Sequence, residues 1–130
     1  MAYGQAGGTL AGFTAGADLS SNQFQIVKVG STAGKVYLCG TSAFAGFVVG
    51  VLQNKPTSGE EALVQFDGVS KLVVATSTIV PGDVIGCNTT SKGTDGGTTD
   101  NGSRIGKALA ASAAANDIIP VLLTPGGWRY

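Results

Sequence analysis

The chain contains no histidine, and charged side chains make up only 12% of its 130 residues. That share is about half of what globular proteins usually carry. Enzymes need poised acids, bases or nucleophiles, and few side chains here could serve as one. The composition therefore favours a structural or binding protein over an enzyme.

Positive charge is also scarce and is not clustered. Eight acidic and eight basic residues cancel, and the six lysines are spread along the chain. Nucleic acids and anionic membranes attract basic patches, so we expect neither as a partner. No apolar run approaches the roughly 20 residues of a membrane helix, and the N-terminus lacks the pattern of a signal peptide.

The chain has two cysteines, Cys39 and Cys87, far apart in sequence and each in or beside an apolar run. Two thiols without histidine rarely complete a tetrahedral metal shell, so we expect no metal and no other cofactor. Two interpretations stay open. The favoured one, for an intracellular origin, is a pair of buried reduced thiols; the other is a disulfide.

What the chain does contain is short β-branched and apolar runs separated by its 21 glycines. A length of 130 residues suits one domain. Regularly spaced short strands with little helix predict an all-β fold, a small single-domain β-barrel or β-sandwich. The expected strands cover residues 23–29, 35–39, 46–52, 60–66, 69–75, 84–87, 104–109 and 117–123.

Particular residues predict how these strands connect. The first two runs are typical of a hairpin with a longer loop, and Asp67-Gly68 predicts a second, tight hairpin. Gly50 indicates a bulge or a close backbone approach, and Pro120 predicts an edge strand or a break. The short run 110–115 is alanine-rich but too short for a stable helix, so we expect an irregular corner there.

Three segments fall outside this pattern. Residues 1–22 form a Gly/Ala-rich N-terminal arm, either disordered or ordered against a neighbour or the domain's own surface. The β-rich domain then covers 23–124, with a polar loop insert at 89–102 that is too polar to join a core. A tail, 125–130, ends the chain. The spaced aromatic and apolar residues of the two ends are the candidate contacts with a partner or neighbouring subunit: Tyr3, Leu10, Phe13, Trp128 and Tyr130.

The carboxylates do not suggest catalysis. Glu60 and Glu61 are adjacent and would point to opposite faces of a strand. Asp67, Asp83 and Asp117 stand at turns or strand starts, where aspartate commonly caps backbone donors. We therefore expect no catalytic residue.

Three segments in order carry a resemblance: GADLSSNQFQIVKVG (16–30), GVLQNKPTSGEEALVQFDGVSKLVVA (50–75), and PGDVIGCNTTSKG (81–93) followed by IGKALAASAAANDIIPVLL (105–123). Together they resemble the bacteriophage capsid cement, or head decoration, proteins. The resemblance covers residues 16–123. The N-terminal arm and the 89–102 insert stand apart as departures from a minimal cement domain.

The resemblance implies a non-enzymatic β domain, made in the host bacterial cytoplasm, that binds the outside of the virion head. Its partner would be the major capsid protein, and it would assemble as a homotrimer at three-fold or quasi-three-fold positions and stabilise the shell. The alternative is a carbohydrate- or surface-binding β module displayed on a virion. The matched polar and turn positions are expected to hold turns: Gln53, Asn54, Pro56, Gly68, Ser70, Gly82 and Asp83.

Overall fold

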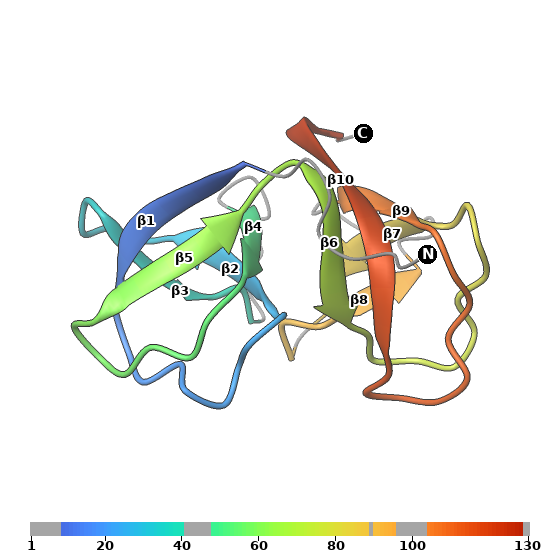
Figure 1. The fold of residues 1–130 in the computed structure, drawn as a ribbon, viewed down its shortest axis with the longest axis horizontal. Coiled ribbons are helices and arrows are strands. Elements are labelled where there is room, and N and C mark those ends of the chain that lie inside the picture. Colours follow the sequence, from blue (N-terminus) through green and yellow to red (C-terminus); the bar gives the residue numbers. More distant parts are fainter. Residues whose placement is uncertain (1–8, 41–47, 89, 96–103, 129–130) are drawn as a thin grey trace.

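The computed structural model of the chain describes residues 9–40, 48–88, 90–95 and 104–128. Within them every regular element is a strand, which confirms the all-β prediction (Figure 1). The strands are β1 (Leu10–Ala15), β2 (Ile26–Val29), β3 (Lys35–Leu38), β4 (Val48–Leu52), β5 (Glu61–Gln65), β6 (Gly68–Val73), β7 (Val84–Cys87), β8 (Gly93–Asp95), β9 (Arg104–Ala108) and β10 (Ile118–Trp128).

The first five strands close into a barrel in the order β1-β3-β2-β4-β5. The β2–β3 pair is antiparallel and is the predicted hairpin. The barrel closes because β1 pairs with β5 on one side and, in parallel, with β3 on the other. All edges of this sheet are therefore covered, which removes the hazard of open strand edges.

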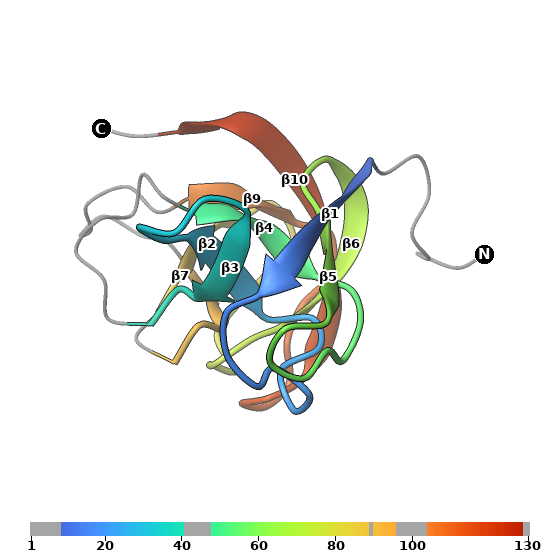
Figure 2. The same ribbon diagram turned by 90° about the vertical axis from the view of Figure 1, so that its left-hand side faces the viewer.

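The last five strands form a second sheet in the order β6-β10-β9-β7-β8. Its two outer strands come together where Val74 forms a parallel bridge with Gly93. The Ala75 N–H donates to the Gly93 carbonyl at 2.8 Å. The second sheet is thus curled nearly into a barrel. Figure 1 shows the two sheets as adjacent lobes, and in Figure 2 the first barrel lies in front of the second sheet.

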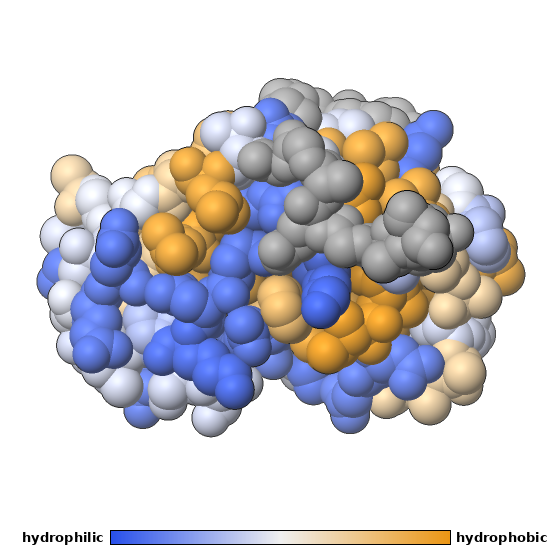
Figure 3. Space-filling model, in the orientation of Figure 1, coloured by the Kyte–Doolittle hydropathy of each residue, from blue (hydrophilic) through white to orange (hydrophobic). Residues whose placement is uncertain are grey.

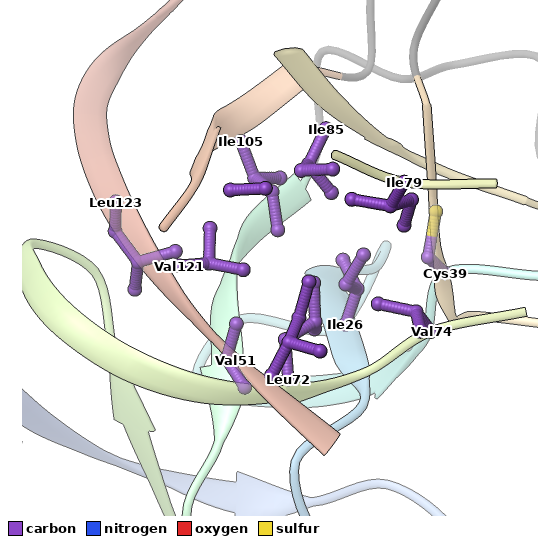
Figure 4. Close-up of a cluster of buried hydrophobic side chains, with 12 residues drawn as sticks. Ile26, Cys39, Val51, Leu72, Val74, Ile79, Ile85, Ile105, Val121 and Leu123 are labelled. Atoms are coloured by element: carbon purple, nitrogen blue, oxygen red, sulfur yellow. The ribbon is translucent and has the colours of Figure 1, made fainter. Parts of the chain in front are cut away.

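Two hydrophobic cores fill these lobes, and β2 and β4 contribute to both. Val27 and Leu52 lie in the core of the first barrel. Their neighbours Ile26 and Val51 point the other way, into the core beneath the second sheet (Figure 4). Successive side chains of a strand alternate between faces, so an unbroken apolar run such as that around β4 is what a strand covered on both sides requires.

The prediction of a tight hairpin at Asp67-Gly68 is wrong. β5 pairs with β1 and β4, whereas β6 pairs with β10 in the other sheet. Gly68 does adopt a left-handed backbone, with φ of 76°, so a turn is present. It redirects the chain from one sheet to the other. The buried Gln65 stabilises this crossover because its Nε2 donates to the carbonyls of Asp67 at 2.8 Å and Val69 at 3.0 Å.

Two strands lie where the sequence analysis placed none. β1 belongs to the segment assigned to the arm, so the folded unit begins before residue 23. β8 lies within the segment assigned to the polar loop, and the buried Gly93 and Ser91 show that this part joins the packed domain. The expectation that the whole of 89–102 is a loop outside the core is therefore wrong for 91–95; residues 96–102 lie outside the described part of the chain.

Pro120 does not mark an edge or a break, because β10 lies between β6 and β9 and continues to Trp128. The Pro120 carbonyl accepts the Leu109 N–H at 3.0 Å, so its nitrogen faces the same side. β9 ends at Ala108, just before that point. Proline has no backbone N–H. At position 120 this N–H would have faced the residue just beyond the end of β9, so the β9–β10 ladder loses little by its absence.

Gly50 permits a close approach of β4 to β5, as predicted. A Cβ added there would collide with the Gln65 carbonyl, which is rigid backbone. The β2–β4 register also shifts beside it, between Val27 and Lys28. We predict that Gly50→Ala lowers the free energy of unfolding by about 2 kcal/mol or more, because overpacking against backbone forces the strands apart.

Chemical denaturation monitored by circular dichroism measures this change. The matched control is Gly12→Ala in β1, whose Cβ would meet only the far end of the Glu61 side chain, which can rotate away. Equal stabilities of the two variants would contradict the close-approach explanation for Gly50.

Candidate interaction surface

The outer face of β6 and β10 exposes a group of apolar side chains, in a chain of which only 12% of the residues are charged. On β10, Ile118 and Leu122 are 53% and 39% exposed, while the intervening Ile119 and Val121 are buried. This strict alternation gives the sheet one inward and one outward apolar face. An outward apolar face is the unusual feature, since the exposed side of such a sheet normally carries polar residues.

Cross-strand pairing gathers these side chains. Leu122 lies opposite Val69, and Ile118 lies opposite Val73. Both valines and Pro120 are partly exposed. We call this surface the β10 face; it consists of Val69, Val73, Ile118, Pro120 and Leu122. Figure 3 shows apolar surface over this lobe; the other lobe has a smaller apolar patch in its upper part and is hydrophilic in its lower part.

Two exposed lysines are part of the same outer surface. Lys71 lies opposite Pro120, and Lys107 lies opposite Leu122. The Lys71 Nζ is 5.6 Å from the centre of the Phe24 ring, within the range of a cation–π contact. Lys71 therefore lies within the β10 face, between Val69 and Val73, and Lys107 lies beside it. Exposed apolar groups next to charged ones are typical of a protein-docking surface.

The β10 face rests on a rigid support. Leu72 and Val121 beneath it are fully buried. The buried Ser70 hydroxyl accepts a hydrogen bond from the Gln53 Nε2 at 2.9 Å and donates to the Lys71 carbonyl at 2.9 Å. Ser70 therefore ties β6 to the end of β4, and the expectation that it holds a turn is wrong.

Of the other positions that the family resemblance predicted to hold turns, Asn54 extends a strand, whereas Gly82 and Asp83 do form a turn. Asn54 extends the ladder of β5, donating to the Glu61 carbonyl at 2.9 Å and accepting the Leu63 N–H at 3.0 Å. Gly82, with φ of 94°, and Asp83, whose Oδ2 accepts the Val80 N–H at 3.0 Å, hold a turn as predicted.

The carboxylates mostly cap backbone donors. The Asp117 Oδ2 accepts the N–H groups of Ala113 and Ala114 at 2.7 and 3.0 Å, as predicted for a cap. The Glu60 carboxylate accepts the Thr57 N–H at 2.8 Å, and this bond lowers the pKa of Glu60 below its usual value. Within the described residues, no three histidine, cysteine or acidic side chains are grouped to hold a metal ion.

The five candidate contact residues are not brought together by the described structure. Leu10 is 52% exposed on β1. Phe13 is partly buried and packs against the first core. The Trp128 backbone pairs with Arg104 at the end of β10, while Tyr3 and Tyr130 lie outside the described residues. Sequence reasoning missed Ile118 and Leu122, although their i, i+4 spacing on a predicted strand marks one face.

The chain is thus a small all-β protein with an exposed apolar face. No helix in the described part of the chain has the length and hydropathy to cross a bilayer. The model of the phage cement protein family matches residues 4–123, so the chain belongs to that family and is a structural, non-enzymatic component of the virion capsid surface. The match includes most of the N-terminal segment, so this segment is part of the family domain and not a departure from it.

A solved structure supports the fold. The chain is similar to the crystal structure of the head fiber gp8.5 N base of bacteriophage phi29, with a TM-score of 0.62 and 12% sequence identity. The similarity covers 95% of this chain and 99% of that one. No curated protein has a significantly similar sequence.

Asp67 holds the start of β1 through a contact that is distant in sequence. Its two carboxylate oxygens accept the Thr9 N–H at 2.6 Å and the Thr9 hydroxyl at 3.0 Å. We predict that Asp67→Ala speeds amide hydrogen exchange at the Leu10 end of β1 by about tenfold, because local opening becomes easier. Asp95→Ala, which removes an exposed carboxylate from β8, is the control. Unchanged exchange in the Asp67 variant would show that the strand ladder alone holds β1.

Proposed function

We propose that this cement protein docks on the capsid shell through the β10 face, assembles as a trimer at three-fold or quasi-three-fold positions, and stabilises the shell against internal DNA pressure. Its partner in this proposal is the major capsid protein. Capsid binding follows from family membership; the face, the trimer and the stabilisation are what we propose.

The observation that carries the proposal is the exposed apolar β10 face on a domain with 12% charged residues. Burial of apolar surface contributes roughly 25 cal/mol per Å², and a stable protein interface requires at least about 1,000 Å² in total. The outer face of two strands provides only part of that area. Contacts with neighbouring copies on a symmetric shell would supply the rest and multiply modest affinities.

The contacts between copies are proposed to involve the chain ends. Leu10, half exposed on β1, is the best placed of them. Phe13 is partly buried against the first core, and its exposed part would make the contact. Tyr3, Trp128 and Tyr130 complete the proposed set.

The face is tested by binding to undecorated heads. We predict that Ile118→Lys and Leu122→Lys each lower the affinity at least tenfold, because a lysine ammonium would have to be desolvated in the interface, while thermal stability stays close to that of the parent. Val80→Lys is the matched control, since Val80 and Ile118 are both 53% exposed but Val80 lies outside the β10 face. Co-sedimentation of labelled protein with heads measures the affinity.

Full binding by both β10-face variants would overturn this assignment. Loss of binding in the Val80 variant as well would point to a general charge effect in place of a specific face.

The trimer and the stabilisation are tested on the same particles. We predict that decorated, DNA-filled heads show three-lobed density at three-fold or quasi-three-fold positions in cryo-electron microscopy. They should also retain DNA to a temperature several degrees higher than undecorated heads, since ligands that bind only the intact state stabilise it. Density of single copies, or identical DNA-release temperatures, would contradict the corresponding part of the proposal.

A further inference from the structure

The two cysteines come from different sheets and meet at the boundary between the two lobes. Cys39 directly follows β3 of the first barrel, and Cys87 is the last residue of β7 in the second sheet. Cys39 is buried in the core beneath the second sheet, and Cys87 packs against that core. Figure 4 shows the Cys39 side chain on the side of this core where Val74 and Ile79 lie, in the connection between β6 and β7. Both are free thiols.

The thiols contact one another directly. A hydrogen bond joins the two side chains, and it lowers the pKa of Cys39 and raises the pKa of Cys87. The charge of Lys28 favours a thiolate at both positions. A thiolate is therefore more available at Cys39 than at Cys87.

Hydrogen bonds between the two lobes fix the backbone close to both cysteines. The Cys39 N–H donates to the Ile26 carbonyl at 3.1 Å. From the other sheet, the Ser91 carbonyl accepts the Ile26 N–H at 2.8 Å, and the Ser91 hydroxyl accepts the Gly40 N–H at 2.7 Å. Cys87 lies opposite Gly93, two residues beyond Ser91. The hydrogen bonds that join the lobes at this boundary therefore also bring the segments of the two cysteines together.

We propose that Cys39 and Cys87 form a disulfide that locks the two lobes together after the virion leaves the reducing cytoplasm of its host. A protein on the capsid surface passes from a compartment that keeps thiols reduced to an extracellular medium in which disulfides persist. The bond would add a covalent connection between the two sheets.

The oxidant is a low-molecular-weight disulfide such as glutathione disulfide. Cys87 is the more exposed of the pair. Its thiol gives its proton to the neighbouring Cys39 thiolate as the Cys87 sulfur attacks the small disulfide, and one small thiolate is expelled, which leaves a mixed disulfide on Cys87. The released small thiolate takes this proton from Cys39, and the Cys39 thiolate then attacks the Cys87 sulfur and expels the second small thiolate. The two protons lost by the cysteines end on the two released thiols, so the protein is oxidised by two electrons and the small disulfide is reduced to two thiols.

The experiment treats the purified protein with glutathione disulfide and follows the intact mass. Formation of the lock removes two hydrogen atoms and protects both cysteines from alkylation, and peptide mapping finds Cys39 joined to Cys87. The midpoint of thermal unfolding should rise by roughly ten degrees, because a long stretch of chain becomes a closed loop, and dithiothreitol should reverse the change.

Cys87→Ser provides the control, since it retains a polar group able to hydrogen-bond but cannot form the disulfide; its midpoint should not rise. A stable glutathione adduct on the parent protein, a disulfide between two molecules, or no reaction would each overturn the proposal.

In a second experiment, virions from a lysed culture should carry the disulfide and infected cells should contain the dithiol. A dithiol in released virions would overturn the claim that the disulfide forms after release. This result would not depend on which face binds the capsid.

Discussion

The structure depends on two strands that are buried on both of their faces. β2 and β4 place Val27 and Leu52 inside the first barrel and Ile26 and Val51 beneath the second sheet. One pair of strands thus serves as a wall common to both cores. A polar residue at any of these positions would be buried without partners on one side or the other, at a cost of several kcal/mol.

This common wall determines which surface remains for docking. Because the inner faces of both sheets are used for packing, the protein can contact a partner only through outer faces, ends and loops. The outer face of β6 and β10 is largely apolar. The buried Ser70 hydroxyl connects β6 to Gln53, at the end of β4 in the first barrel. The face is therefore held in place before docking, which lowers the entropy that docking would cost.

Strand content could be predicted from the sequence because it is a local property. The runs that became β4, β5 and β7 show their β-branched and apolar character directly. β1 could not be predicted, since LAGFTA lacks strict alternation and its order comes from β5 and from the distant Asp67. The Asp67-Gly68 error has the same origin: a turn is local, but which strand pairs with which depends on the whole fold.

The exposed face was only partly predictable. Alternation on the last strand is visible in the sequence, yet Pro120 suggested an edge, and the position of β10 between two neighbours requires the topology. The cysteine pair was left as two alternatives, because sequence separation says nothing about whether two side chains meet. Once the strands are paired, a single hydrogen bond joins them.

The order of strands along the chain has a mechanical consequence. All of the first sheet precedes residue 66 and all of the second follows it, so only one stretch of peptide passes between the lobes. A shearing force that moves one lobe relative to the other would meet interlocked side chains and a few lateral hydrogen bonds, whereas each sheet resists through its full ladder. Such a movement would have to pull Ile26 and Val51 out of the core beneath the second sheet, so a strained shell would meet the resistance of both lobes together.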